Sequence, residues 1–281
     1  MSALVGVSPL LLLVVAGLSI MLIDAFTEDR AELAVVTAVS LFVAAAVAGA
    51  LLTGGELAAA PDLVTRYLAV DRLGLFFDVV ICVGAGLSVL LAGGYLREHG
   101  FERGEYYVLV LFTAFGAMIL ARAVDLLSIF LGLETMSLGA YALVAYRRTS
   151  ARAIEGAVKY FLLGSFAAAI LLFGSALLYG ATGHTDLVGI QASVAAGEAD
   201  AILTIFALVM LIVGLAFKVG AVPFHMWVPD AYEGAATPVT TFMSVVVKSA
   251  AVAVLIRVLL GAFGDPSTMG LYTGWTPVII I

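Results

Sequence analysis

Long apolar stretches, separated by short polar connections, run through almost the whole chain. A helix needs about 20 mostly apolar residues to cross a hydrocarbon core of roughly 30 Å. Eight stretches meet this requirement, and the predicted spans are residues 6–25, 33–52, 73–95, 106–122, 124–146, 155–180, 201–228 and 238–262. The pattern therefore predicts an all-α polytopic membrane protein.

The composition indicates the same class. Of the 281 residues, 63% are hydrophobic and 12% are charged, and the mean hydropathy is +1.17. Soluble domains carry roughly 25% charged and 45–50% apolar residues. The net charge of −7 is spread over the loops, and no basic patch indicates nucleic acid. Because no basic segment precedes the first apolar stretch, we interpret that stretch as a span and not as a cleavable signal peptide.

A short apolar run, WTPVIII, starts at Trp275 and reaches the end of the sequence. Seven residues of helix rise only about 10 Å, which is too short to cross a membrane. We therefore expect this run to begin a ninth span. The favoured interpretation is that the sequence is a fragment of a longer protein, and the alternative is that a partner completes the span.

The arginines predict how the helices are oriented. Alternate crossing places Arg30, Arg97, Arg103, Arg147, Arg148 and Arg152 on one side, and Arg66, Arg72, Arg122 and Arg257 on the other. Cytoplasmic loops carry an excess of Lys and Arg. The first side is therefore predicted to be cytoplasmic, with the N-terminus outside.

Three ionisable residues lie deep inside predicted spans: Glu134, Lys218 and Lys248. Each costs on the order of 2.5–3.5 kcal/mol at membrane depth, so such residues are candidate functional sites. A structural ion pair that pins helices together would need one lysine, but two are present. A buried lysine balanced between desolvation and a carboxylate can gain and lose a proton near neutral pH. The trio therefore predicts a proton relay, with the structural pair as the alternative.

The seventh stretch is interrupted. Pro223 has no N–H to donate and crowds the preceding turn, and Gly220 weakens the helix further. A broken helix beside a buried charge is typical of transporters, whereas a plain proline kink is the alternative. His225 follows the break and either passes protons or packs as a neutral side chain. Lys159, four residues after Glu155, either pairs with it or forms an entry to the relay.

Other polar residues are predicted to be structural. Arg122 and Asp125 are expected to pair at the outer surface, and Asp78 to reach the membrane interface. Thr237 is expected to cap the eighth span, with Pro238 in its first turn. Small residues let membrane helices approach closely, and we expect such contacts at Gly139, Gly164 and Gly174.

Three segments are long and specific enough to suggest a family: LLSIFLGLETMSLGAYALVAY, AIEGAVKYFLLGSFAAAILLFGSALLYGATGHTDL and GLAFKVGAVPFHMWVPDAYEGAATPVTTFMSVVVKSA. They resemble the antiporter-like membrane subunits of respiratory complex I, and most closely the N-type subunit of bacterial NADH–quinone oxidoreductase. The likeness runs through the whole chain and is strongest over residues 125–255.

The resemblance implies a fold with two inverted five-helix repeats, each containing a broken helix. Residues 1–105 would then hold three preceding helices, residues 106–262 the first repeat with its broken seventh helix, and residues 263–281 the start of a truncated second repeat. The family's second-repeat lysine or glutamate lies beyond this sequence, so no exit path for protons can be predicted from it.

The resemblance also implies roles for individual residues. Glu134 would pair with Lys218, and Lys248 would continue the path toward the centre of the membrane. Lys159 and His225 match positions on the family's polar axis and are secondary candidates.

The hypothesis is a proton-translocating membrane subunit of NADH–quinone oxidoreductase, and hence part of an enzyme. We expect this chain to bind no cofactor or metal, and NADH, FMN, iron–sulfur clusters and quinone to bind partner subunits. Its expected surroundings are the other membrane subunits of complex I and the lipid bilayer of a bacterial inner membrane. The alternatives are a subunit of a multi-subunit cation/proton antiporter and a structural subunit that translocates nothing.

Overall fold

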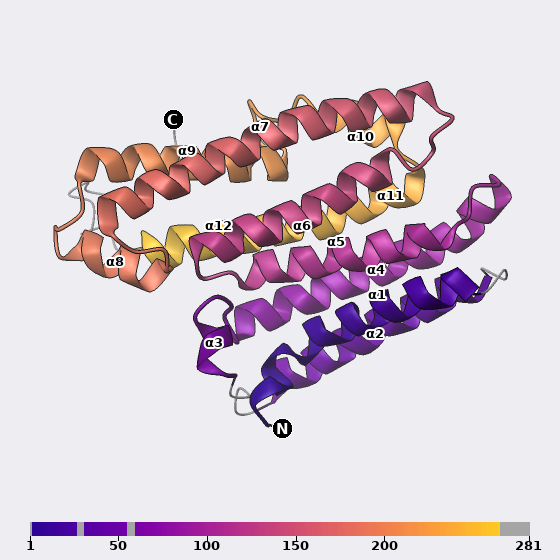
Figure 1. Cartoon of the computed structure of the whole chain (residues 1–281), viewed down its shortest axis with the longest axis horizontal. Helices are drawn as coiled ribbons and strands as arrows, with labels where there is room; N and C mark the ends of the chain where they lie inside the picture. The colour runs from indigo at the N-terminus through magenta and orange to yellow at the C-terminus, as the bar shows by residue number, and fades with distance from the viewer. Residues whose placement is uncertain (1, 27–30, 55–59, 265–281) are drawn as a thin grey trace.

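The computed structural model describes residues 2–26, 31–54 and 60–264, and this part of the chain is a bundle of long helices lying side by side (Figure 1). Within it, eight helical segments are long and apolar enough to cross a membrane, which confirms the eight predicted spans. Seven are the helices α1 (Ser8–Phe26), α2 (Ala31–Thr53), α4 (Arg72–Glu98), α5 (Gly104–Arg122), α6 (Leu126–Val144), α7 (Ala151–Thr182) and α9 (Ala201–Val219). The predicted ninth span lies outside the described residues.

The eighth span, Thr237–Ala262, is a composite of four helical pieces. It runs through α11 (Thr237–Phe242), the π-helical turn η2 (Met243–Val247), α12 (Lys248–Ile256) and a second π-helical turn, η3 (Arg257–Ala262). π-helical turns inside α-helices are rare and are often found at functional sites. Lys248 directly follows the first of these turns, and Arg257 is the first residue of the second.

Shorter elements lie between the spans. They are the 3₁₀ helix η1 (Ser2–Val7) and the α-helices α3 (Asp62–Thr65), α8 (Leu187–Ala195) and α10 (Val228–Gly234). In Figure 1, α3 and α8 lie at one end of the bundle, and α10 and the start of α11 lie toward the other. Thr237, predicted as the cap of the eighth span, is instead its first helical residue, because the cap position falls on Ala236.

The bundle has an N-terminal layer and a C-terminal layer that share a centre (Figure 1). Helices α1, α2 and α4 pack together, and α1 and α4 also contact α5. Helix α5 in turn packs closely on α6, while α7 pairs with α9 and α10 on the far side. The composite eighth span crosses this centre and contacts α4, α5 and α9.

Small residues at the predicted positions allow the helices to approach. A Cβ atom added to Gly174 of α7 would come within 2.8 Å of the Cβ of Met210 on α9. Gly139 and Gly164 likewise face Thr113 and Tyr141 of neighbouring helices with no room for a side chain. All three predicted close contacts are therefore confirmed, in agreement with the use of small residues at membrane helix interfaces.

The seventh predicted span, residues 201–228, is interrupted at Gly220 as expected, and its continuous helix ends nine residues before the predicted end. Helix α9 ends at Val219, and Gly220 has a left-handed φ of +77° that a glycine adopts without strain. Its N–H closes the helix by donating to the carbonyls of Ala216 and Phe217. A series of turns follows before α10 begins at Val228. The predicted broken helix is confirmed, and Gly220 determines where it breaks.

The predicted pair between Arg122 and Asp125 is wrong. Ala123 is extended, so the two residues do not share a helical face. Asp125 instead caps α6 by accepting from the N–H of Leu127 at 2.8 Å, and its other oxygen accepts from the Thr185 hydroxyl at 2.7 Å. Both carboxylate oxygens are thus occupied by donors other than arginine.

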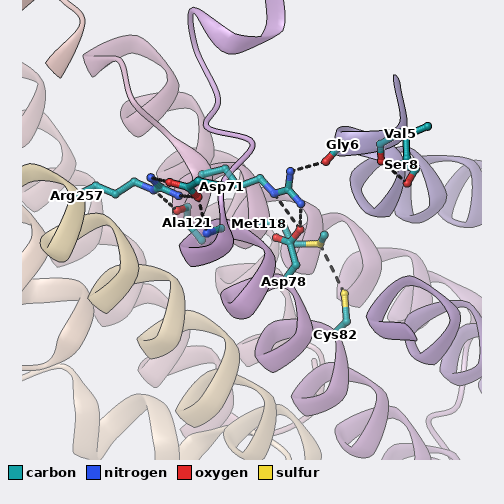
Figure 2. A network of polar contacts seen from close by, with 11 residues as sticks. Val5, Gly6, Ser8, Asp71, Asp78, Cys82, Met118, Ala121 and Arg257 are labelled. Carbon is teal, nitrogen blue, oxygen red and sulfur yellow. Dashed lines mark hydrogen bonds and ion pairs between the residues drawn. The ribbon is translucent and has the colours of Figure 1, made fainter. Parts of the chain in front are cut away.

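Arg122 is paired with Asp78, which was predicted to reach the interface but is fully buried. The Nε of Arg122 donates to Asp78 Oδ2 at 2.9 Å, Nη2 forms a short ion pair with the same oxygen, and Nη1 donates to the carbonyl of Gly6 at 2.7 Å. Figure 2 shows Asp78 and Gly6 converging from different helices. A charge this deep is stable only when it is paired and hydrogen-bonded, which is why the two residues find each other.

A second arginine completes this network. Arg257, from the end of the eighth span, makes a bidentate contact with Asp71 at 2.7 and 2.8 Å and donates from Nε to the carbonyl of Ala121 at 2.6 Å (Figure 2). Asp71 also caps α4 by accepting from the N–H of Gly74 at 2.7 Å. The network ties the first, third, fourth and eighth spans together at one end of the bundle.

Candidate functional site

Lys218 lies in the last turn of α9, directly before the helix break, and its side chain is 1% exposed. The carbonyl groups at the end of a helix carry partial negative charge, which favours a cation there. A fully buried ammonium nevertheless requires further compensation. The surrounding side chains supply it.

Lys218 donates a hydrogen bond from Nζ to the hydroxyl of Tyr141 at 3.0 Å. The same ammonium lies 4.9 Å from the ring centroid of Tyr141, 5.2 Å from that of Tyr160 and 5.6 Å from that of Phe217. Cations are attracted to aromatic faces at such distances, and more strongly when desolvated. Three rings therefore form an aromatic cage around the ammonium.

The helix break closes this cage. Trp227, which follows the break, stacks on Tyr160 with ring centroids 4.2 Å apart and planes 12° apart. Its indole Nε1 donates to the carbonyl of Phe217 at 2.9 Å. A continuous helix would carry Trp227 away from α9, whereas the turns after Gly220 bring it back against Phe217.

Glu134 lies on the same side of α6 as Tyr141, because seven residues are about two helical turns. Glu134 is half-buried, and its Oε1 is buried with no hydrogen-bond partner among the described residues. It interacts electrostatically with both Lys218 and Tyr141. No direct ion pair joins Glu134 and Lys218 in the described part of the chain, and the ammonium donates instead to the hydroxyl of Tyr141.

Tyr141 is the residue that the sequence interpretation missed. Its spacing from Glu134 was the available signal, since positions i and i+7 share a helix face. Ser137 falls between them on that face, and its hydroxyl lies beside that of Tyr141. Glu134, Ser137 and Tyr141 thus form a row of polar side chains that ends at Lys218.

Lys248 opens α12 directly after the π-helical turn and is half-buried. Its Nζ lies 5.5 Å from the ring centroid of Tyr232 on α10. Tyr232 is in edge contact with Trp227 at a centroid distance of 6.0 Å. The aromatic side chains of Trp227 and Tyr232 therefore connect the surroundings of the buried Lys218 with those of the half-buried Lys248, and both come from the segment that follows the break.

Lys159 makes the predicted pair with Glu155, one helical turn away on α7, at 2.7 Å. It makes a second ion pair with Asp230 of α10 at 2.9 Å. Arg152 and Glu233, 3.6 Å apart, form another link between the same two helices. Lys159 therefore holds α10 against α7 and is not buried with Lys218.

His225 is not brought to the cage. Its side chain is exposed on the turns between α9 and α10, with no polar contact to the other described residues. Pro223 is also exposed there. Of the predicted site residues, the structure groups Glu134 with Lys218. Within the described ranges, Lys248 is linked to this group only through a series of aromatic contacts, in which Tyr160 stacks on Trp227 and Trp227 contacts Tyr232.

The chain contains the features of an antiporter-like membrane protein, and comparison with known proteins identifies its family. The family model described as NADH:quinone oxidoreductase/Mrp antiporter, transmembrane, matches residues 123–275. This match covers more than half of the chain, which therefore belongs to that family.

Individual relatives within this family indicate which kind of membrane complex the similar proteins come from. The chain is 52% identical to the NADH-quinone oxidoreductase subunit N 1 of Sorangium cellulosum, over 99% of this chain and 58% of the relative. It is 34% identical to a chain of respiratory complex I from Thermus thermophilus with bound aureothin, at a TM-score of 0.73, over 89% of this chain and 52% of that one. An archaeal membrane-bound sulfane sulfur reductase has the same fold, with a TM-score of 0.79 at 23% identity over 96% of this chain and 55% of its own. The chain thus spans about half the length of the proteins it matches.

Proposed function

We propose that this chain is part of a proton-translocating membrane subunit of NADH–quinone oxidoreductase. The names of its similar relatives support the assignment to that complex. The observation that carries the proposed activity is the ammonium of Lys218, buried at a helix break beside a hydroxyl and within electrostatic reach of Glu134. A purely structural pair would have placed the carboxylate on the ammonium.

The proposed mechanism is a relay between two lysines. Glu134 and Tyr141 stabilise the protonated form of Lys218. When Glu134 is moved away or neutralised, Lys218 releases its proton, and the neutral amine of Lys248 accepts it. The proton travels along bound water and hydroxyl groups past Trp227 and Tyr232. Redox reactions in partner subunits supply the energy by changing the distance between Glu134 and Lys218.

Buried polar atoms without a protein partner ordinarily hold ordered water. Among the described residues, such atoms occur along the proposed path at Glu134 Oε1, Tyr160 Oη and Tyr232 Oη. Lys159 and His225 remain secondary candidates for the entry of protons. Lys159 has the more favourable position, because its two carboxylate partners connect the surface to α10.

The wider assignment follows from the same family. The subunit would lie in a bacterial inner membrane with its N-terminus outside. It would be accompanied by the other membrane subunits of complex I. NADH, FMN, the iron–sulfur clusters and quinone would bind partner subunits, while this chain moves protons only.

The decisive experiment is Lys218→Ala in the full-length subunit, assembled in its complex and reconstituted into vesicles. We expect electron transfer coupled to little or no proton uptake. Arg66→Ala is the matched control, because it removes an exposed cation. An unchanged number of protons pumped per electron in Lys218→Ala would rule out the relay.

The family description also names Mrp antiporters, so a subunit of a cation/proton antiporter is the second candidate. The two differ in their response to sodium. Proton movement driven by NADH oxidation in sodium-free vesicles supports the first function. Proton movement that requires a sodium gradient and no electron donor supports the second.

A further inference from the structure

A cavity of about 260 Å³ opens at the end of the bundle opposite the Arg122 network. It lies between two connections, residues 99–103 and residues 145–149, which join α4 to α5 and α6 to α7. Four crossing helices therefore begin or end around it. Such a cavity lies at the level of a membrane surface, where lipid headgroups are found.

The wall of this cavity carries positive charge. Arg103, Arg147 and Arg148 line it, all three are exposed, and none has a carboxylate partner among the described residues. Two further arginines that the structure describes at this end are paired: Arg97 with Glu102 and Arg152 with Glu233.

Among the residues that the structure describes, no carboxylate contributes to the wall. The Glu102 side chain, which is adjacent in sequence, is engaged by Arg97 at 3.2 Å and by the Tyr107 hydroxyl at 2.8 Å. Glu105, in the first turn of α5, acts electrostatically on Tyr146 but does not line the cavity. The cavity therefore attracts anions.

Two aromatic side chains, Phe101 and Tyr146, also line the cavity, together with His99, Gly100 and Thr149. Phe101 and Tyr146 lie with ring centroids 6.5 Å apart, and the guanidinium carbon of Arg147 lies 5.9 Å from the centroid of Phe101. Aromatic residues concentrate where a protein meets the boundary between acyl chains and headgroups. A soluble anion would need only the arginines, whereas a lipid also uses an apolar surface beside them.

We propose that this cavity binds the phosphate headgroup of an anionic membrane lipid. Guanidinium groups match the geometry of phosphate oxygens with paired hydrogen bonds. Basic pockets between membrane helices bind such headgroups on the cytoplasmic side, and the arginine count predicts that this end of the bundle is cytoplasmic. The lipid would fasten the two connections together without taking part in proton transfer.

The first test is photo-crosslinking in membranes that contain the full-length protein within its complex. The probes are a diazirine-labelled cardiolipin and a diazirine-labelled phosphatidylcholine, and mass spectrometry locates the labelled peptides. We expect cardiolipin to label the peptides that contain residues 99–103 and 145–149. Equal labelling by phosphatidylcholine, or labelling only elsewhere, would overturn the proposal.

The second test compares two double variants of the purified complex. Arg147→Gln with Arg148→Gln removes two charges from the cavity, whereas Arg66→Gln with Arg72→Gln removes two from the opposite end. Each basic side chain near a membrane surface contributes roughly fivefold to the binding of anionic lipid, so the first variant, which lacks two, should bind cardiolipin about 25-fold more weakly. Equal affinity in the two variants would contradict the proposal.

Inorganic phosphate distinguishes a lipid from a free anion. Millimolar phosphate added to the wild-type complex should leave cardiolipin crosslinking unchanged, because it lacks the acyl chains that hold the lipid at this depth. Displacement of cardiolipin by phosphate would reveal a site for a soluble anion and would overturn the lipid assignment.

Discussion

The ammonium of Lys218 donates its hydrogen bond to the hydroxyl of Tyr141 and not to the carboxylate of Glu134. A hydroxyl can accept from one side and donate to the other, which a carboxylate in its ionised form cannot do. Tyr141 therefore holds the ammonium by a hydrogen bond, while Glu134 acts on both Lys218 and Tyr141 electrostatically. This arrangement gives the buried lysine a partner that does not fix its protonation state.

Tyr141→Phe should remove the hydrogen-bond acceptor of Lys218 while preserving the aromatic cage. Removing an acceptor from a buried charged donor costs about 1.5–3 kcal/mol, which is a factor of roughly 10 to 150 in an equilibrium constant, so the charged ammonium of Lys218 should lose much of its stabilisation. We expect proton pumping by the reconstituted full-length complex to fall strongly. Tyr179→Phe, which removes a hydroxyl from an exposed tyrosine, should leave pumping intact. Similar pumping by both variants would exclude a role for the Tyr141 hydroxyl.

Amine-specific labelling should separate the three lysines of this sequence. Lys159 has a side chain that is 43% exposed, Lys248 is half-buried and Lys218 is 1% exposed. In detergent, we expect an N-hydroxysuccinimide ester to react fastest at Lys159 and slowest at Lys218. Mass spectrometry of the labelled peptides gives the three rates, with the denatured protein as reference. Equal protection of Lys159 and Lys218 would contradict the placement of the cage.

Arg122 and Asp78 should be strongly coupled in stability. Arg122→Met alone leaves the carboxylate of Asp78 buried without its partner, and breaking a buried pair in this way costs about 3–5 kcal/mol. Arg122→Met with Asp78→Leu should cost less than the sum of the single variants, because no orphan charge remains. Unfolding of the four proteins in detergent measures the coupling. Additive effects would show that the pair contributes little.

Acid should weaken the contact between Asp71 and Arg257. Burial opposes ionisation of Asp71, but hydrogen bonds and positive charge from Arg257 outweigh it and hold the pKa of Asp71 below its usual value. A lowered pKa stabilises the fold above the unfolded value of about 4 and loses that contribution as the pH falls further. Asp71→Asn keeps the cap of α4 but should lose this acid dependence. The test is to measure the melting temperatures of the wild type and of Asp71→Asn between about pH 3 and pH 6. If the two melting temperatures fall in parallel as the pH is lowered, Asp71 does not contribute the expected acid dependence.

Gly220→Ala should disturb the helix break. A left-handed conformation costs an L-residue roughly 1–2 kcal/mol, and the added Cβ would lie 2.9 Å from Cγ2 of Val228. Gly180→Ala is the matched control in α7, where nothing lies within 4 Å of the new Cβ and helix propensity favours alanine. We expect lower thermal stability for Gly220→Ala and equal or higher stability for Gly180→Ala. A stable Gly220→Ala variant would mean that Gly220 does not set the break.

The number and order of the spans could be predicted because the membrane imposes a length on each apolar stretch. The exact end of the seventh helix could not be predicted, because a proline indicates a break nearby but not the residue at which the helix ends. In the structure the helix ends at Val219, directly before Gly220. The partner of Arg122 was mispredicted because sequence proximity favoured Asp125. Asp78 lies 44 residues away and meets Arg122 only when α4 and α5 pack.

The depth of Glu134, Lys218 and Lys248 was readable from hydropathy, because a charge inside an apolar stretch is conspicuous. The aromatic cage was not, since tyrosine and tryptophan are common in membrane helices and carry no signal of their own. Only the packing of α6, α7 and α9 shows that Tyr141 and Tyr160 face the same ammonium. His225 was a candidate because histidine can transfer protons and because it follows the helix break. The turns after Gly220 nevertheless leave its side chain exposed.

The two ion pairs of the Arg122 network have a consequence for biosynthesis. Asp71 precedes Arg257 by 186 residues, whereas Asp78 precedes Arg122 by 44. At roughly 5–20 residues per second, Asp71 waits about 10–40 s for its partner while the ribosome makes the rest of the bundle. Its side chain is 40% exposed and can stay hydrated meanwhile, whereas Asp78 is fully enclosed and receives its arginine from the next helix. The fully buried Asp78 thus pairs with Arg122, which is translated soon after it, whereas the partly exposed Asp71 pairs with the much later Arg257.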